Sequence, residues 1–248
     1  MTTPSPVSDT PPRQPGRLGR ALIRVLMKQA HVVEAESVAE GFRLLTLDGP
    51  EFRGVQWLPG QKMQIAMGSA FVARTFTPIE WDATAGRTRI LGYAHGDGPG
   101  SAWLRNARPG DACDVFGPRA SLDAGQAFGL RVVLGDETSI GLAYALSRQT
   151  PGAALQGLFE VNAVAPARAA LARLALDGAE LFERTQNDAQ LEDIERRLPA
   201  LADSGASFVL TGKAASIQRL RRVLKALGVP AARLTAKPYW APGKTGLD

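Results

Sequence analysis

The sequence contains one cysteine, Cys113, and two histidines, His31 and His95. A lone cysteine excludes an internal disulfide bond and a cluster of thiolate metal ligands. A transition-metal site built by the chain alone would therefore depend on carboxylates, and we predict no metal site. We expect any redox chemistry to come from an organic cofactor.

Long apolar segments are also absent. No apolar run approaches the about 20 residues that span a bilayer, and the first sixteen residues lack the apolar segment of a secretory signal. We therefore expect a cytoplasmic protein without stable membrane insertion. The composition, 45% hydrophobic and 21% charged, predicts a folded chain with one large or two modest domains.

Positive charge is confined largely to the N-terminus. Residues 1–30 carry a net charge of +4, and the whole chain carries +5, so the remainder carries only +1. A sustained basic surface for a nucleic acid is missing, and we expect no such partner. The five prolines in residues 1–17 predict a disordered tail. Residues 18–28 show helical spacing, which predicts a short amphipathic helix against the body or, alternatively, on a membrane surface.

Residues 29–122 contain short segments with β character, and these segments are separated by residues that favour turns. The predicted strands cover 29–37, 42–48, 62–67, 71–77, 87–94 and 111–116, with one helix at 101–107. This regular spacing predicts a small antiparallel barrel, and we place its domain at residues 18–125.

From residue 130 onward, apolar strands and helices alternate. The predicted strands are 130–134, 155–161 and 207–210, and the predicted helices are 138–148, 166–175, 189–201 and 216–227. This order predicts a doubly wound parallel α/β domain, at residues 126–248, that ends in an aromatic tail.

Two clusters in the first domain could bind a cofactor. In the predicted strand Arg74-Thr75-Phe76-Thr77, an arginine can pair with a phosphate, and Phe76 can stack on a planar ring. An ordinary barrel strand is the alternative. In the segment His95–Trp103, a glycine-rich turn precedes the predicted helix, whose N-terminus can accept a pyrophosphate. The alternative is a plain loop in which Ser101 is the helix N-cap.

Two further clusters lie in the second domain. Gly135-Asp136-Glu137-Thr138 follows an apolar strand, where α/β sheets bind nucleotides, but it lacks the G-x-G-x-x-G pattern. Its two acidic residues would repel a phosphate unless they cap the helix or bind a ribose. Near the C-terminus, Tyr239 and Trp240 form either an aromatic lid on a flat cofactor or a surface anchor.

In this order, these segments resemble the siderophore-interacting protein family of FAD-dependent ferric-siderophore reductases, in the ferredoxin-reductase-like superfamily. The matching segments are RTFTPIEWD (74–82), HGDGPGSAW (95–103), ARPGDACDVFGPRAS (107–121), LGDET (134–138) and YWAPGK (239–244). The resemblance extends from about residue 24 to the end. It implies an N-terminal antiparallel FAD-binding β-barrel followed by a C-terminal doubly wound α/β NAD(P)H-binding domain.

The resemblance also implies roles for individual residues of the barrel. Arg74 would pair with the FAD pyrophosphate, Phe76 would stack on the flavin or ribityl, and Thr77 would reach the N5/O4 edge. His95 would line the pyrimidine ring through its backbone. The pyrophosphate would meet the helix start at Gly98, Gly100, Ser101 and Ala102.

In the second domain, Asp136, Glu137 and Thr138 would border the nicotinamide, and Trp240 would lie close to the isoalloxazine. We also assign Lys213, Arg168 and Lys244 to the nucleotide or substrate side. Lys213 replaces a frequent glutamate and would meet a phosphate or an anionic substrate, unless it is a solvated loop lysine. Arg168 could meet a 2′-phosphate.

The chain departs from the family pattern at three places. Phe76 replaces a tyrosine, which keeps stacking but loses a hydroxyl. Ile79 stands where many members have an arginine, and YWAPGK replaces a YWRRG ending. The last two changes remove cations that would attract an anionic ferric chelate.

The predicted function is an FAD-dependent ferric-siderophore reductase that releases Fe(II), with NADPH, NADH or a ferredoxin as electron donor. The flavin would carry the chemistry, so no catalytic side chain is predicted. One alternative is an NAD(P)H:acceptor flavoreductase acting on a quinone or a protein. Another is a non-catalytic protein that binds flavin or siderophore.

Overall fold

The computed structural model describes residues 27–67, 72–125, 129–149 and 153–244. The predicted tail at 1–17 and residues 18–26 of the predicted amphipathic helix lie outside these ranges. Lys28, which we expected in that helix, instead begins the first strand. The predicted domain limits at 17/18 and 125/126 stay predictions.

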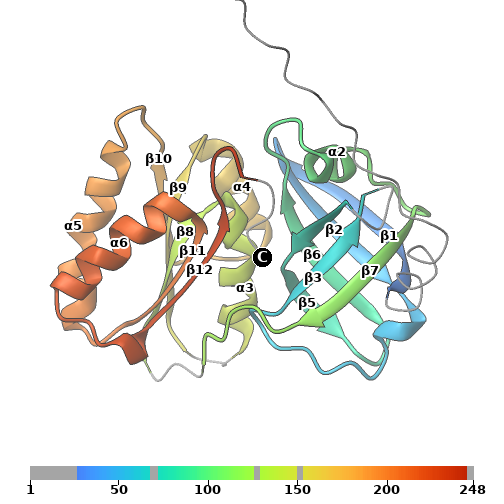
Figure 1. The fold of residues 1–248 in the computed structure, drawn as a ribbon, viewed down its shortest axis with the longest axis horizontal. Coiled ribbons are helices and arrows are strands. Elements are labelled where there is room, and N and C mark those ends of the chain that lie inside the picture. The colour runs from blue at the N-terminus through green and yellow to red at the C-terminus, as the bar shows by residue number, and fades with distance from the viewer. Residues whose placement is uncertain (1–26, 68–71, 126–128, 150–152, 245–248) are drawn as a thin grey trace, which may run out of the picture.

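The described N-terminal residues form one antiparallel sheet with the strand order β4-β3-β7-β1-β2-β6-β5. Its two edge strands, β4 and β5, follow one another in the chain and are separated only by Thr77. The sheet therefore has to curl until its edges approach, which produces the barrel seen in Figure 1. The strands are β1 (Lys28–Ala39), β2 (Phe42–Asp48), β3 (Lys62–Ala66), β4 (Ala73–Phe76), β5 (Pro78–Asp82), β6 (Arg87–Tyr93) and β7 (Ala112–Arg119).

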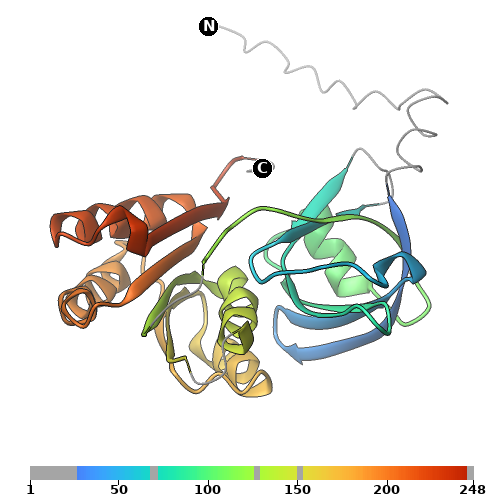
Figure 2. The same ribbon diagram turned by 90° about the horizontal axis from the view of Figure 1, so that it is seen from below.

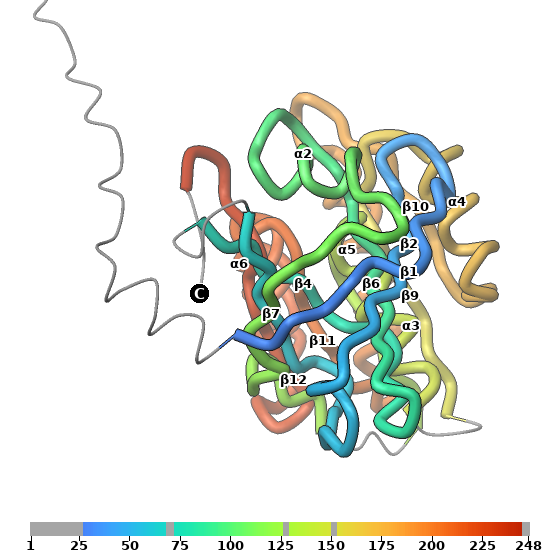
Figure 3. The backbone as a smooth tube through the Cα atoms, turned by 90° about the vertical axis from the view of Figure 1, so that its right-hand side faces the viewer, coloured from blue at the N-terminus to red at the C-terminus, as the bar shows by residue number. Residues whose placement is uncertain are grey.

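Two short helices accompany the barrel. The 3-10 helix η1 (Pro50–Phe52) follows β2, and α2 (Pro99–Asn106) lies at one end of the barrel (Figures 1 and 3). The predicted antiparallel barrel is confirmed. The apolar core of the barrel includes Phe52, Met63, Ile65, Ile90 and Val115.

The C-terminal residues form a parallel sheet with the order β10-β9-β8-β11-β12. The order reverses between β8 and β11, which defines the switch point of a doubly wound fold and confirms the predicted class. Its strands are β8 (Arg131–Asp136), β9 (Leu155–Val161), β10 (Ala179–Glu183), β11 (Ser207–Lys213) and β12 (Leu234–Trp240). Its helices are η2 (Glu137–Ser139), α3 (Ile140–Gln149), α4 (Val164–Arg173), α5 (Ala189–Asp203), α6 (Ala214–Ala226) and η3 (Ala231–Arg233).

The helices cover the parallel sheet in two layers. Helices α5 and α6 pack on the face away from the barrel, and α3 and α4 lie between the sheet and the barrel (Figure 2). The layer formed by α3 and α4 belongs to a core that both domains share. Phe42, Leu44 and Ile79 of the barrel pack there with Ile140 and Leu142 of α3. The two domains are therefore held together by buried apolar contacts rather than by a linker alone.

Gly141 allows the close approach of α3 to the barrel. A Cβ atom at this position would lie 2.9 Å from Ile79 Cγ2. Polar contacts surround this apolar centre. Tyr144 donates its hydroxyl to Glu80, which also pairs with Arg89 at 2.9 Å.

Two more polar contacts join the domains on the α4 side. Arg173 donates two hydrogen bonds to Glu36, at 2.7 and 2.9 Å, and Asn162 Nδ2 donates to the Tyr93 hydroxyl at 3.1 Å. The hydrogen bond from Arg173 lowers the pKa of Glu36. Burial alone would raise the pKa of Glu80, but its hydrogen bonds from Tyr144 and Arg89 outweigh burial and leave that pKa below the usual value.

Three strands are missing from the sequence-based prediction. All three, β5, β10 and β12, are edge strands in the described sheets. Pro78 begins β5 and Pro238 lies in β12, and proline is tolerated at sheet edges because one side of an edge strand needs no N–H donor. The prediction that Tyr239 and Trp240 lie in a tail beyond the last element was therefore wrong. Both residues belong to β12, which pairs with β11.

The described residues contain no group of three metal-ligating side chains. Within the same ranges, every helix falls short of the length or the apolar character that a membrane crossing requires. Cys113 is a free, buried thiol in the barrel, and burial raises its pKa to about 12. At neutral pH this thiol is protonated and unreactive.

We expect Glu80→Gln to lower the free energy of unfolding by about 1 kcal/mol at neutral pH, because it weakens a half-buried charged hydrogen bond between the domains. A carboxylate with a lowered pKa stabilises the fold above its unfolded-state value of 4.5 and loses this effect as the pH falls through its folded-state value. The difference between wild type and variant should therefore shrink as the pH falls below 4.5 and disappear only below the lowered folded-state pKa. Chemical denaturation across this pH range measures it.

The control is Asp48→Asn. It breaks a solvent-exposed salt bridge with Arg87, and both residues belong to the barrel domain. It should change the free energy of unfolding by less than about 0.5 kcal/mol. An equal effect of the two substitutions would contradict the special contribution of the contact between the domains.

Candidate functional site

The two predicted binding segments of the barrel lie side by side. Arg74 on β4 packs its aliphatic stem on Gly100 of α2, where a Cβ atom would lie 3.0 Å from Arg74 Cγ. Phe76, on the same face of β4, packs against Trp103 of α2 with ring centroids 5.5 Å apart. The guanidinium of Arg74 donates to the carbonyl of Ala73 at 2.8 Å. The structure therefore brings the arginine strand and the glycine turn into one surface.

The N-terminus of α2 is open. Its N-cap, Gly98, is exposed and has no side chain to cap the first turn, and Pro99 has no N–H at the first helical position. No atom lies within 4 Å of where a Cβ on Gly98 would be, and Ala102 is exposed one turn further along. An uncapped helix N-terminus next to an arginine is a suitable site for an anion such as a pyrophosphate.

Ser101 does not have the capping role that we predicted. Its hydroxyl is buried and donates to the carbonyl of His95 at 2.6 Å. Because Ser101 is the third residue of α2, it cannot act as the N-cap, and its hydrogen bond instead fixes the glycine turn between β6 and the helix. The interaction holds the open N-terminus of α2 in place while leaving its first N–H groups uncapped.

Aromatic rings from both domains meet at the junction. The imidazole of His95, an exposed residue, lies 6.1 Å from the Tyr93 ring and 5.7 Å from the Trp240 ring, measured between centroids. Beside this row, Thr77 and Tyr239 share a side-chain hydrogen bond, although burial still raises the pKa of Tyr239 to about 12. The residues predicted from the four separate segments therefore converge on one junction.

The switch point is organised around the fully buried carboxylate of Asp136. This carboxylate accepts from Thr138 N at 2.9 Å and from the Thr138 hydroxyl, and Ser139 completes a capping box. It also accepts from Lys213 N at 2.9 Å and from Trp240 Nε1 at 2.7 Å. Of the roles that the sequence left open, helix capping is the one present.

The electrostatics of Asp136 are mixed. Burial is the largest effect and leaves the pKa of Asp136 above its usual value, although hydrogen bonds from Thr138 and Trp240 and the charge of Arg184 partly oppose it. Four donors on one carboxyl group favour its ionised form. The site therefore holds an internal carboxyl group that accepts hydrogen bonds at the carboxyl end of β8.

Arg184, just beyond β10, is a site residue that the sequence did not reveal. Its guanidinium lies 3.0 Å from Glu137, 3.6 Å from Glu160 and 3.7 Å from Asp136, and its side chain is 16% exposed. It also donates to Asn162 Oδ1 at 2.8 Å. Arg184 follows an edge strand that was not predicted, so its position gave no signal. The only available signal was Glu160, a carboxylate inside an apolar strand.

Other predicted residues lie further from this centre. The ammonium of Lys213 lies 3.6 Å from Asp188, and Lys213 reaches Asp136 only through its backbone. Arg168, on α4, and Lys244 are exposed, and their roles toward a ligand stay predictions. Ile79 is buried in the core that the two domains share, so its side chain is not exposed to a bound ligand.

A hollow of about 520 Å³ lies between the barrel and the start of α4. Tyr93 and Glu137 line it from the junction side, Arg43 and Arg105 from the barrel, and Asn162 from the end of β9. This hollow is an opening beside the ring row of Tyr93, His95 and Trp240.

Two family models match the chain. The siderophore-interacting FAD-binding domain matches residues 61–122, and the siderophore-interacting protein model matches residues 130–243. Their boundary falls between the antiparallel and the parallel sheet. A comparison with curated protein sequences finds no match.

Solved structures share the fold. A siderophore utilization protein from T. fusca has 24% identity and a TM-score of 0.69, and the match covers 90% of this chain and 95% of that one. The siderophore-interacting protein SipS from Aeromonas hydrophila has 21% identity and a TM-score of 0.66, with 88% and 93% covered. Phthalate dioxygenase reductase, at 12% identity, has a TM-score of 0.74, with 89% and 70% covered.

The two models follow one another along most of the chain, and they agree with the order of the two sheets. The chain belongs to the siderophore-interacting protein family and has the ferredoxin-reductase-like fold.

Proposed function

We propose that this protein is an FAD-dependent reductase that releases iron from ferric siderophores as Fe(II). The observation that carries the proposal is the open N-terminus of α2 beside Arg74, at the junction where His95 and Trp240 approach each other. A flavin dinucleotide needs an anion site for its pyrophosphate and an aromatic, partly enclosed place for its ring. The junction supplies both kinds of surface.

The residues present fit FAD. Arg74 and the first N–H groups of α2 would hold the pyrophosphate. The absence of a Cβ leaves the backbone open at Gly98, and at Gly100 it lets the stem of Arg74 pack against α2. Phe76 supplies an aromatic face on β4 where the family has a tyrosine. Bound FAD would accept electrons from a donor and pass them singly to Fe(III).

The side chains at the junction orient and shield rather than exchange protons. Thr77 and Tyr239 connect β4 to β12, and Trp240 is held by Asp136, so the two domains present fixed groups to a bound ring. The proposal needs no catalytic acid or base. Fe(II) binds hard oxygen donors less tightly than Fe(III) does, so reduction alone releases the metal from a chelate.

The electron donor and the acceptor are the finer parts of the proposal. NADPH, NADH and a ferredoxin are the candidate donors, and a quinone or a protein is the alternative acceptor. A quinone is a candidate because the chain lacks the arginine that many family members have at position 79. Because Ile79 is buried against Gly141, that position does not favour a quinone over a ferric chelate.

We expect Arg74→Ala to weaken FAD binding about 10- to 100-fold, because a charge-assisted phosphate contact contributes roughly 1.5–3 kcal/mol. Titration of the flavin-free protein with FAD, followed by flavin fluorescence, measures the affinity. Arg74→Lys should retain part of it.

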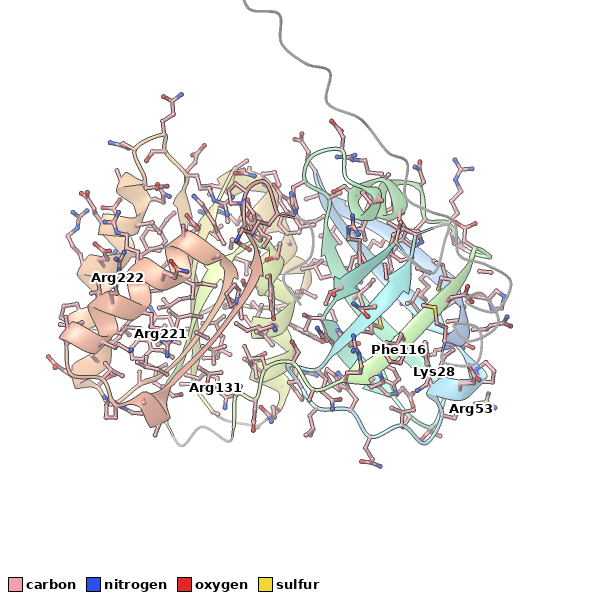
Figure 4. The ribbon with its side chains drawn as sticks, viewed as in Figure 1. Lys28, Arg53, Phe116, Arg131, Arg221 and Arg222 are labelled. Atoms are coloured by element: carbon pink, nitrogen blue, oxygen red, sulfur yellow. The ribbon has the colours of Figure 1, made fainter. Side chains whose placement is uncertain are left out.

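The matched control is Arg53→Ala, since Figure 4 shows Arg53 at the end of the barrel opposite α2. Its affinity for FAD should stay within about twofold of the wild type, as expected for a surface position outside the site. Equal losses in the Arg74 and Arg53 variants would contradict the pyrophosphate assignment.

The activity is tested without oxygen, with the FAD-loaded protein, a ferric hydroxamate or catecholate chelate, and a colorimetric trap for Fe(II). NADPH, NADH, a reduced ferredoxin and photochemical reduction serve as separate electron sources. We expect Fe(II) to form at a rate that depends on the FAD-loaded protein and falls with flavin occupancy in Arg74→Ala.

Two other outcomes oppose this proposal. Flavin that is reduced and reoxidised by a quinone, with no Fe(II) from any chelate, would indicate the acceptor flavoreductase. A flavin band that none of the donors bleaches would indicate a binding protein without reductase activity.

A further inference from the structure

The first helix of each domain that could bind a phosphate differs in its N-terminal capping. In the barrel, α2 begins at an exposed glycine without a side-chain cap. In the parallel sheet, the chain leaves β8 through η2 into α3, and Asp136 caps this start with its own carboxylate. In open α/β folds, the second position is where the pyrophosphate of a dinucleotide binds. The place for that phosphate is already occupied by a carboxyl group of the protein.

Because of this capping, the N–H groups that could bind a phosphate already have partners within the protein. Thr138 N donates to Asp136 Oδ1 at 2.9 Å, and Asp136 N donates to Ser139 Oγ at 3.3 Å. The other carboxylate oxygen accepts from Lys213 N, which belongs to the loop after β11. The N–H groups on both sides of the switch point are therefore directed at one internal carboxylate.

Space at the switch point is equally restricted. Gly212 has a φ of +100°, and a Cβ there would overlap the carboxylate of Asp136. A Cβ on Gly135 would overlap Ser139, whose hydroxyl accepts from the Thr211 hydroxyl at 2.8 Å. These glycines bring the loops after β8 and β11 against one another. Here the close approach of backbone serves an internal contact instead of a ligand.

Charge adds to the restriction. Asp136, Glu137 and Glu160 are buried around the single guanidinium of Arg184, which leaves an excess of two negative charges if all are ionised. The ammonium of Lys213 is directed at Asp188. A pyrophosphate placed here would meet like charges in a poorly solvated region, where repulsion is strong.

We propose that Asp136 is a specificity-determining residue that occupies the anion position of the switch point, anchors Trp240 there and excludes a dinucleotide pyrophosphate. This inference rests on the proposed function, because it concerns the electron donor of the same site. The donor of this protein does not place a pyrophosphate between β8 and β11. A nicotinamide donor would have to bind by another route along the junction.

The test uses ADP-ribose, which carries the pyrophosphate of a dinucleotide without its nicotinamide. Calorimetry on the FAD-loaded protein compares wild type with Asp136→Ser, in which a shorter residue still caps a helix but removes the charge and opens space. We expect the variant to bind ADP-ribose at least tenfold more tightly than the wild type. Tight binding by the wild type, or no gain in the variant, would overturn the proposal.

Asp188→Ser is the matched control. It removes an equal charge near the same edge of the sheet, beside Lys213, but leaves the cap formed by Asp136 intact. Its affinity for ADP-ribose should stay within twofold of the wild type. A gain as large as that of Asp136→Ser would show that general charge, and not the occupied cap, controls binding.

A measurement on the wild type keeps the proposal testable if the Asp136 variant does not fold. The backbone amide resonances of Thr138 and Lys213, which both donate to Asp136, report directly on the cap. We expect ADP-ribose at millimolar concentration to leave both resonances in place. Shifts of both amides upon saturation would mean that the pyrophosphate displaces Asp136, which overturns the proposal.

The proposed reductase activity is separable from this inference. Photochemical reduction of the flavin supplies electrons without a nucleotide, so Fe(II) release in that arm does not depend on Asp136. Failure of Fe(II) release would reject the reductase proposal, and the ADP-ribose measurements would still decide the role of Asp136.

Discussion

The carboxylate of Asp136 connects three parts of the parallel sheet through a small number of hydrogen bonds. It caps the turn into α3, accepts the backbone N–H of Lys213 after β11 and holds the indole of Trp240 at the end of β12. These donors come from the ends of three different strands or from the turns after them. Because the carboxylate is fully buried, its loss would leave several donors unsatisfied at once. Together with the pairing of β12 and β11, this group fixes the position of Trp240 beside His95.

The junction is also held together by the core that the two domains share. Ile79 and Leu44 of the barrel pack with the residues of α3, and Gly141 brings the backbones close. Opening the domains would expose this apolar surface and break the contacts of Glu80 and Glu36 as well. A bound ring at the junction is therefore positioned by a preformed surface. Access has to come from its margins, such as the hollow beside Tyr93 and Asn162.

The sequence predicted much of this architecture because its strongest signals are local. The apolar strands at 130–134 and 155–161 and the helices after them were found because buried parallel strands and amphipathic helices have clear periodicities. The strands β5, β10 and β12 were not found, since edge strands tolerate proline and polar residues and need little apolar pattern. Consequently Arg184, which follows β10, could not be placed near Asp136 by any local rule.

The same limit applies to the site residues. Arg74, Gly100, His95 and Trp240 were proposed from separate segments, and the structure brings them to one junction. The N-cap role of Ser101 was wrong, because a serine before a helical run is typical of an N-cap, while the helix begins two residues earlier, at Pro99. Its role toward a cofactor stays a prediction. Burial and long-range partners decide such roles, and neither can be read from spacing.

The starts of α2 and η2 have similar backbone N–H groups, but only the start of α2 is open to an anion. Both α2 and the η2–α3 segment follow a strand and present N–H groups at the domain junction. The N-cap Gly98 has no side chain, so the first N–H groups of α2 remain available to a ligand. The N-cap Asp136 accepts hydrogen bonds from the N–H groups at the start of η2, so those groups are not available. A phosphate-bearing ligand that approaches the junction therefore meets one attractive position and one repulsive position. Because the repulsive position also holds Trp240, selectivity against phosphate and the placement of the aromatic ring are consequences of the same carboxylate.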